Sequence, residues 1–367
     1  MVRALFVSYG VVVDRPDAPA MIGVLKRCLR FIDHLATAGI EPHLLHFGAL
    51  PKRDPLVRRV LPTLALHRLP EGPPRPAFER LYRGIRPDVV VLGEGPARGM
   101  MWAASRAAHE LGIRQVCIEN YYAPSHPPRL ERGAGWVDRW ILLGLPLLGG
   151  RGDDFGPISA RVLLVPPLLD AADDSIREPV DLTILGYDDA AERRGLALFS
   201  RMPPGSRARL LSRRFEPDRA GDRIRTVRCG PGQLDLIGLP TDARLRSYLA
   251  TSKIVVAKSG YQQMLESLAV GTPVLASAAP GGIPKGWLAP ELERFVRYLP
   301  EADHDWTDAL CATATWLGER PEMPWTEQIL RLERPALHAA RALAQLLRDA
   351  RAPAAPRLAR SGASQAR

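Results

Sequence analysis

The chain has 367 residues, of which 46% are hydrophobic, so it is long enough for two domains that each have an apolar core. Its net charge of +10 is carried mostly by arginines that are scattered along the sequence. No basic stripe with interleaved aromatic residues occurs, and we therefore expect no nucleic-acid partner. The four cysteines lie far apart, which argues against a zinc site or a disulfide framework and favours a reduced, cytoplasmic setting.

The sequence predicts neither a secretory leader nor a membrane-spanning helix. Residues Met1–Tyr9 have the pattern of a strand rather than that of a basic region followed by an apolar one. The most apolar later stretch, Trp140–Gly150, is too short to span a bilayer and contains Pro146. Peripheral membrane contact stays open.

Strands and helices are expected to alternate in the first half of the chain. Ala4–Val7 is a short apolar run typical of a buried parallel strand. Ala20–Ala38 repeats apolar residues every three or four positions, which predicts a helix with one buried face, and Gly39 ends it. The other elements expected here are strands at 43–47, 88–92, 115–119, 140–143 and 162–165 and a helix at 97–111. This alternation predicts a doubly wound parallel sheet.

A second alternating unit follows Pro166–Pro179, a segment without periodicity that we interpret as an interdomain linker. Its expected elements are strands at 181–185, 209–212, 225–229, 234–237, 254–257 and 273–276 and helices at 188–202, 244–250, 260–270, 307–317 and 335–350. The predicted division is an N-terminal domain at 1–168, a linker at 169–180, a C-terminal domain at 181–334, a C-terminal helix at 335–351 and a disordered tail at 352–367.

The segment Lys253–Gly282 carries the clearest functional signal. It is predicted to form a strand, a Ser259-Gly260 turn with Ser259 as the N-cap, a helix closed by Gly271, and a second strand. Gln262 and Glu266 lie one turn apart on a face of this helix that is expected to be exposed.

This arrangement suits a ligand with an anionic part and a hydroxylated part. Ligands of parallel sheets bind outside the carboxyl ends of the strands, and the N–H groups at a helix N-terminus favour anions. Ser259 and Gly260 are therefore a candidate diphosphate site. Glu266 follows about 9 Å along the helix axis, where its carboxylate could accept two hydrogen bonds from a diol. On spacing alone, an ordinary Ser-Gly turn before an amphipathic helix is an equally good interpretation.

The segment resembles the donor-binding region of GT-B glycosyltransferases, and in particular the family of the N-acetylglucosaminyltransferase of peptidoglycan synthesis. The matching positions, in order, are Ser259, Gly260, Glu266, Gly271, Pro273, Val274 and Leu275. The resemblance implies two Rossmann-like domains facing a cleft, with the Ser-Gly turn at the diphosphate and Glu266 on the ribose hydroxyls. It also implies contact between the nucleotide base and the backbone around Leu239 and Thr241.

The expected reaction is transfer of a sugar from a nucleoside-diphosphate donor, such as a UDP-sugar, to a hydroxyl or amine of an unidentified acceptor. It would be inverting and would need no metal or other cofactor. Gly186, Gln262, Gly281 and Gly282 complete the expected donor side, and Asn120 and Tyr121 form a candidate acceptor-side patch.

Two departures from the family keep other functions open. Val24 stands where the family has a histidine that can act as the base. Three explanations are open: Asp14 or Asp17 is the candidate base, the acceptor needs little activation, or transfer activity has been lost and only binding is kept. The loop after Gly186 carries Asp188 and an adjacent acid, which would repel a diphosphate unless a basic group intervened. The alternatives are a non-catalytic GT-B relative that binds a nucleotide or a partner enzyme, and a nucleotide-sugar hydrolase or epimerase.

Overall fold

The structure is a computed structural model. It describes residues 1–9, 23–35, 38–48, 50–51, 54–96, 99–120, 135–145, 161–212, 214–215, 224–278, 283, 288, 290–300, 305–332 and 335–351. The expected tail at 352–367 lies outside these described residues.

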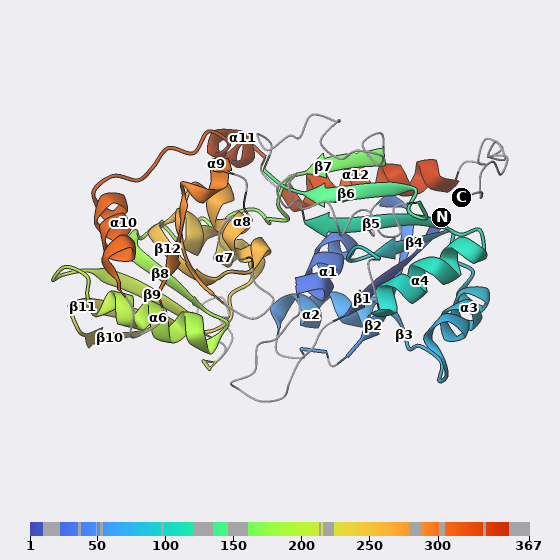
Figure 1. The fold of residues 1–367 in the computed structure, drawn as a ribbon, viewed down its shortest axis with the longest axis horizontal. Coiled ribbons are helices and arrows are strands. Elements are labelled where there is room, and N and C mark those ends of the chain that lie inside the picture. Colours follow the sequence, from blue (N-terminus) through green and yellow to red (C-terminus); the bar gives the residue numbers. More distant parts are fainter. Residues whose placement is uncertain are drawn as a thin grey trace, which may run out of the picture.

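The first half of the chain forms a parallel sheet of seven strands in the order β3-β2-β1-β4-β5-β6-β7 (Figure 1). Its elements are β1 (Val2–Tyr9), α1 (Gly23–Leu35), β2 (Ile40–Phe47), α2 (Pro55–Val60), a 3-10 turn (Leu61–Thr63), β3 (Ala65–His67), α3 (Pro74–Ile85), β4 (Val89–Leu92), α4 (Gly99–Glu110), β5 (Arg114–Asn120), β6 (Arg139–Leu143) and β7 (Val162–Val165). Strands β1 and β4 are buried almost throughout, as their apolar runs predict.

The region between β2 and β4 contains elements that the sequence did not reveal. Helix α2 begins after Asp54, whose carboxylate accepts hydrogen bonds from Leu56 N and Val57 N at 3.0 and 3.3 Å. This Asp-Pro pair is an N-cap followed by a proline in the first turn. Helix α3 is amphipathic and buries only Ala77, Phe78 and Tyr82.

The second half forms another seven-stranded sheet in the order β10-β11-β9-β8-β12-β13-β14, parallel except between β10 and β11. Its elements are β8 (Val180–Gly186), α6 (Asp189–Phe199), β9 (Arg207–Ser212), β10 (Arg225–Cys229), β11 (Gly232–Ile237), α7 (Asp242–Ala250), β12 (Ser252–Lys258), α8 (Tyr261–Ala269), β13 (Val274–Ser277), α9 (Pro290–Glu293), β14 (Val296–Leu299), α10 (Thr307–Gly318) and α11 (Thr326–Leu330). The expected fold class, two doubly wound domains, is confirmed.

The last helix, α12 (Pro335–Arg351), returns to the first sheet and packs on α1 (Figure 1). Its buried side chains Leu343 and Leu347 share a core with Leu25 and Leu29 of α1. The chain therefore passes between the two sheets twice, once through the proposed linker at 169–180 and once before α12.

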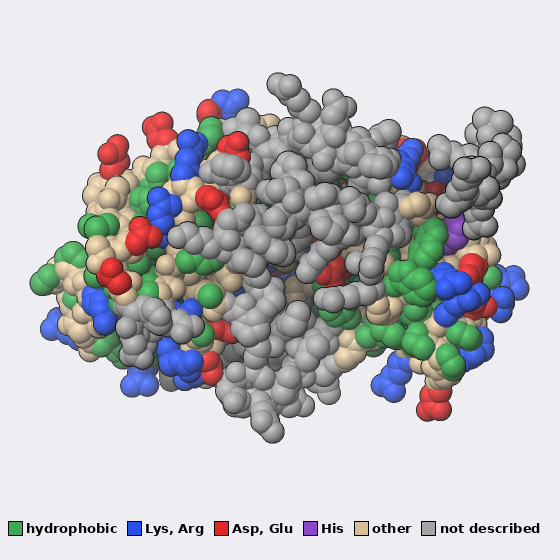
Figure 2. All heavy atoms as spheres, in the orientation of Figure 1, with side chains coloured by type: hydrophobic (Ala, Val, Ile, Leu, Met, Phe, Trp, Pro, Cys, Tyr) green, Lys and Arg blue, Asp and Glu red, His purple; other side chains and the backbone are tan. Residues whose placement is uncertain are grey.

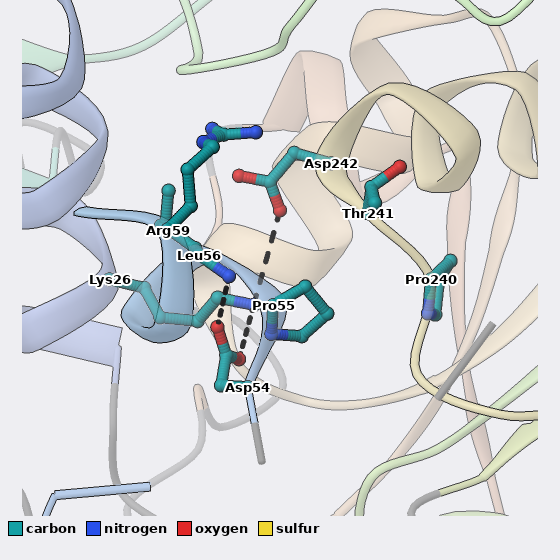
Figure 3. Close-up of a pocket in the computed structure, with 8 residues that line it drawn as sticks. All are labelled: Lys26, Asp54, Pro55, Leu56, Arg59, Pro240, Thr241 and Asp242. Carbon is teal, nitrogen blue, oxygen red and sulfur yellow. Dashed lines mark hydrogen bonds and ion pairs between the residues drawn. The ribbon is translucent and has the colours of Figure 1, made fainter. Parts of the chain in front are cut away.

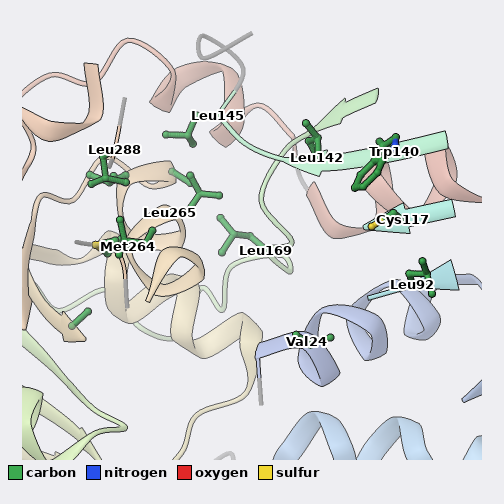
Figure 4. Packing of buried hydrophobic residues seen from close by; sticks show 14 of the residues in the cluster. Val24, Leu92, Cys117, Trp140, Leu142, Leu145, Leu169, Met264, Leu265 and Leu288 are labelled. Atoms are coloured by element: carbon green, nitrogen blue, oxygen red, sulfur yellow. The ribbon is translucent and has the colours of Figure 1, made fainter. Parts of the chain in front are cut away.

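The two halves are joined by a continuous apolar cluster. Figure 4 shows side chains of this cluster from the first half, such as Val24 and Leu92, and from α8, such as Met264 and Leu265. Leu169, which lies in the proposed linker, belongs to the same cluster. The interface between the domains is thus built partly from apolar packing, and the ionic contacts described below lie beside it.

Candidate functional site

The predicted diphosphate site lies at the point where the strand order of the second sheet reverses. The connection after β8 leads to β9 on one side, and the connection after β12 leads to β13 on the other, so the switch point lies between β8 and β12. Gly186 ends β8, and Ser259 and Gly260 directly follow β12. Crevices at such switch points are the usual ligand sites of open parallel sheets.

The turn before α8 differs in detail from the sequence expectation. Ser259 is not the N-cap; Gly260 holds that position and provides no side-chain cap. Ser259 is held outside the helix by two backbone hydrogen bonds: its N–H donates to Ser277 O at 2.8 Å, and its carbonyl accepts from Ile283 N at 2.6 Å. The helix therefore begins one residue later, behind a glycine that leaves room for a ligand to approach its first N–H groups.

Basic side chains surround this turn. The side chain of Lys258 lies over Gly260, so that a Cβ there would be 3.2 Å from Lys258 Cε. Arg194 of α6 reaches the end of β13, where its Nη1 donates to Ser277 Oγ at 2.9 Å. Two positive groups near an uncapped helix N-terminus favour an anionic ligand.

The acids after Gly186 have partners within their own loop. Asp188 caps α6, since its Oδ1 accepts from Ala190 N at 3.0 Å. Asp189 pairs with Arg214 at 2.9 Å, and this arginine also lies 3.7 Å from Glu192. These contacts reduce the repulsion that the sequence alone suggested for a diphosphate here.

Glu266 is buried, which corrects the expectation of an exposed face. Only 3% of the residue is accessible, because Arg30 of α1 in the other domain covers it. The Arg30 guanidinium donates to Glu266 Oε1 through Nη1, and Gln262 Nε2 donates to the same oxygen at 3.1 Å. The helix pattern could not show this, because the covering residue comes from the first domain.

Arg30 holds a second carboxylate, that of Asp242 in the first turn of α7. Arg30 Nε lies 2.7 Å from Asp242 Oδ2, and Nη2 lies 3.0 Å from Oδ1, a two-pronged contact. Lys26 adds a bridge between the domains, with Nζ 3.0 Å from Asp54 and 4.0 Å from Asp242. We call these five residues, Lys26, Arg30, Asp54, Asp242 and Glu266, the interdomain ion cluster.

Burial and charge act in opposite directions on this cluster. Burial opposes the charged form of Arg30, but Asp242 and Glu266 outweigh it and raise the pKa of Arg30 well above its ordinary value. Burial would raise the pKa of Asp242, but Arg30 and Lys26 lower it far below its ordinary value. Arg30 and Asp242 are therefore both ionised at neutral pH.

A pocket lies beside the cluster, between α1 and α2 of the first domain and the start of α7. Figure 3 shows Lys26, Asp54 and Arg59 on one side and Pro240, Thr241 and Asp242 on the other. Thr241 accepts a hydrogen bond from Arg244 N at 3.4 Å and caps α7. The pocket encloses only about 10 Å³, far below the roughly 300–1,000 Å³ typical of ligand sites. In this conformation the first domain closes the positions predicted for the nucleotide base and the ribose.

The first sheet has its own switch point, between β1 and β4. Tyr9 ends β1 and Glu94 follows β4, and the Tyr9 hydroxyl donates to the Glu94 carboxylate. The neighbouring strand β5 ends in Glu119 and Asn120, both buried. Sequence reasoning identified the end of β5 with Asn120 but missed Glu94. The available signal was a Gly-Glu-Gly turn directly after an apolar strand.

Several predicted residues cannot be placed. Asp14, Asp17, Tyr121, Gly281 and Gly282 lie outside the described residues.

Within the described part of the chain, no group of His, Cys, Asp and Glu side chains forms a metal site. Among the described helices, none combines the length and apolar character that a bilayer span needs. On the described part of the face in Figure 2, acidic and basic side chains are interspersed rather than gathered in a basic stripe.

Comparison with solved structures identifies the architecture. The chain superimposes on MurG of Acinetobacter baumannii with a TM-score of 0.57 and 11% identity, covering 95% of this chain and 100% of that one. The glycotransferase of kitacinnamycin gives the same TM-score with 15% identity over 94% and 98% of the two chains. The chain has the GT-B fold.

Other comparisons widen the set of relatives with this fold. The UDP-GlcNAc 2-epimerase of Methanocaldococcus jannaschii matches with a TM-score of 0.52 and 11% identity over 94% of this chain and 100% of that one. A GDP-mannose-dependent alpha-mannosyltransferase of Mycolicibacterium smegmatis is 32% identical over 111 residues. That match covers 27% of this chain and 29% of the mannosyltransferase. No known family profile matches the chain.

Proposed function

We propose that the protein is a glycosyltransferase that moves a sugar from a nucleoside-diphosphate donor to a hydroxyl or amine of an acceptor. The observation that carries this proposal is the Ser259-Gly260 turn and Glu266 at the switch point of the second domain. Similarity to two solved glycosyltransferases over nearly the whole chain, and to a curated mannosyltransferase over a shorter part, supports it.

In this proposal the turn and the start of α8 bind the diphosphate. The backbone N–H groups of the first helical turn face the phosphates, with Lys258 and Arg194 as nearby cations. Negative charge grows on the diphosphate as the bond to the sugar breaks, so these groups stabilise the leaving group most in the transition state. We propose on this basis that the protein needs no metal.

Glu266 binds the ribose diol, and Arg30 must first release it. Two of the three guanidinium nitrogens stay on Asp242 in the present conformation, so only the Nη1 contact has to be exchanged. The two neutral ribose hydroxyls then donate to the Glu266 carboxylate in place of the charged Arg30 Nη1 group. Binding of the donor is thus proposed to loosen the contact between the domains.

The nucleotide is tested with a panel of UDP, GDP, dTDP and ADP by titration calorimetry and thermal shift. UDP and GDP are tested first, because a UDP-sugar epimerase and a GDP-mannose-dependent enzyme are among the relatives. A nucleotide at 100 times its Kd would raise the unfolding free energy by about 2.7 kcal/mol. No stabilisation by any of them would contradict the proposed donor site.

Transfer itself needs a second experiment, since an epimerase of the same fold is among the solved relatives. Each donor sugar that binds is incubated with a mixture of alcohols, phenols and amines, and the products are analysed by mass spectrometry. A new glycoside supports transfer. Free sugar would indicate a hydrolase, an isomerised donor an epimerase, and binding without turnover a non-catalytic relative. We also propose that the protein acts in the cytoplasm, with or without peripheral membrane contact.

A further inference from the structure

The carboxylate of Glu94 lies where a ligand of the first domain would bind. Strand β1 has β2 on one side and β4 on the other, and Tyr9 and Glu94 stand at the carboxyl ends of β1 and β4. The switch point of this sheet therefore lies between these two residues. Glu94 is partly exposed, whereas the carboxylate at the end of the next strand, Glu119, is 1% exposed.

Glu119 is engaged in holding the turn that carries Glu94. Its Oε2 accepts from Gly95 N at 2.9 Å, and its Oε1 accepts from Asn120 N at 2.8 Å. Burial raises the pKa of Glu119, Arg27 opposes this, and the charge of Glu94 adds to the rise. Two carboxylates in such different surroundings can have different roles, one structural and one reactive.

Helix α1 fixes the same turn from the other side. Arg27 Nη1 donates to Gly93 O and to Ile118 O, both at 3.0 Å, which ties the ends of β4 and β5 together. A Cβ on Gly93 would lie 2.8 Å from Val24 Cγ1, so α1 approaches the turn closely at Val24. Val24 is the position at which the sequence lacks the expected histidine. Glu94 follows Gly93 directly and so supplies a titratable group next to this apolar position.

We propose that Glu94 is the general base that activates the acceptor, a role that rests on the proposed function. The Glu94 carboxylate takes the proton of an acceptor hydroxyl as its oxygen forms a bond to the anomeric carbon of the donor sugar. The bond from that carbon to the diphosphate breaks at the same time, and the diphosphate leaves with the electron pair. The Tyr9 hydroxyl, which donates to Glu94, orients the carboxylate. Glu94 then takes the place of Asp14 and Asp17 as the candidate base.

The surroundings keep Tyr9 protonated beside the Glu94 carboxylate. The titratable groups described around Glu94 are Tyr9 on β1, Arg27 on α1, and Cys117 and Glu119 on β5. Burial, and then the charge of Glu94, raise the pKa of Tyr9, so its hydroxyl keeps its proton and remains a donor. Arg27 supplies a positive charge 3.6 Å from the Glu119 carboxylate.

The test compares acceptors that do and do not need a base. Release of nucleoside diphosphate from UDP-N-acetylglucosamine, UDP-glucose, GDP-mannose and dTDP-glucose is followed with 2-phenylethanol or with 4-nitrophenol, which is largely ionised at mildly alkaline pH. We expect Glu94→Gln to lower kcat with the alcohol by roughly 10²- to 10⁴-fold and to leave the rate with the phenolate nearly unchanged. The matched surface variant Glu110→Gln should keep both rates, because Glu110 pairs only with arginines on α3 and α4.

Two further readouts separate a base from a structural residue. Sodium formate should restore part of the alcohol rate in Glu94→Ala, where it can enter the vacated space, but not in Glu94→Gln. The wild type should lose rate with the alcohol at low pH, and this loss should disappear in Glu94→Gln. Donor Kd and the thermal midpoint should be the same in all of these variants and the wild type.

The outcomes are distinguishable. A wild-type protein that binds no donor contradicts the proposed function. A wild-type protein that binds a donor but glycosylates neither probe overturns both transfer and the role of Glu94. If the wild type is active and Glu94→Gln keeps its rate with the alcohol, the role of Glu94 alone is wrong.

Discussion

Arg30 of α1 donates a hydrogen bond to Glu266 of α8, although 236 positions separate the two residues in the chain. Both side chains are buried, at 5% and 3% exposure. The carboxylate predicted to hold the donor ribose is therefore occupied by a guanidinium from the opposite domain. The ion cluster around them links the two domains, and the proposed donor site makes it the point of exchange on donor binding.

Arg30→Gln should destabilise the protein strongly. Removing the guanidinium leaves the buried carboxylates of Asp242 and Glu266 without their main partner. Loss of one member of a buried ionic group typically costs about 3–5 kcal/mol. The measurement is the urea midpoint, followed separately by circular dichroism and tryptophan fluorescence to detect independent unfolding of the domains.

The control for this variant is Arg59→Gln at the edge of the same interface. Arg59 lies 2.6 Å from Asp33 but is 50% exposed, so its removal should cost less than about 1 kcal/mol. Equal effects of the two variants would show that the buried cluster does not stabilise the contact between the domains.

Glu266→Gln should abolish recognition of the ribose hydroxyls. A hydrogen bond to a charged group contributes about 1.5–3 kcal/mol, which corresponds to roughly 10- to 100-fold in Kd. The wild type should bind the best nucleoside diphosphate more tightly than its 2′,3′-dideoxy analogue, and the variant should bind both equally. Calorimetry with both ligands checks this. A variant that keeps the full preference for the ribonucleotide would place the diol elsewhere.

Gly260→Ala should weaken donor binding without unfolding the protein. Gly260 has φ −76°, which alanine adopts readily, and its new Cβ would meet only the flexible side chain of Lys258 at 3.2 Å. The methyl group would nevertheless stand between the ligand and the first N–H groups of α8. We expect at least a tenfold rise in donor Kd, about 1.4 kcal/mol, with an unchanged thermal midpoint.

The control is Gly84→Ala in α3, where a Cβ meets no atom within 4 Å. This change should leave donor binding intact and stabilise the helix by about 0.5–1 kcal/mol. If Gly260→Ala binds the donor as well as this control does, the diphosphate does not approach the turn.

Acid should weaken the protein partly through Asp242. Burial raises the pKa of this carboxyl, but Arg30 and Lys26 outweigh it, so the folded pKa lies below the unfolded value of about 4. The stabilisation by Asp242 is thus fully present above about pH 4 and is lost as the pH falls toward the folded pKa. Urea midpoints between about pH 6 and pH 2 should fall less steeply for Asp242→Asn than for the wild type. Parallel curves would show that Asp242 does not contribute to acid sensitivity.

Local patterns predicted the elements that have strong local signals. The apolar run at β4 and the periodicity of α1 and α8 were sufficient to place these elements to within a few residues. Gly112 and Gly271 follow the ends of α4 and α8 with φ of +70° and +79°, conformations that favour glycine.

The features that sequence reasoning missed depend on distant partners or weak local patterns. Burial of Glu266 requires Arg30, and the shift of the N-cap from Ser259 to Gly260 requires Ser277 and Ile283. The pairing of β1 with β4 places Tyr9 beside Glu94, and this contact between distant parts of the chain identifies Glu94 as the candidate base.

The position of α12 has a consequence for synthesis of the protein on the ribosome. Its residues complete the core that contains Leu25 and Leu29 of α1, and Ala336 N donates to Leu169 O at 2.9 Å. The N-terminal domain is made first, but one face of its core stays uncovered until the last helix leaves the ribosomal tunnel. The C-terminal domain, whose sheet is complete at β14, can finish folding earlier. The domain that is translated first is thus the last to reach its native state.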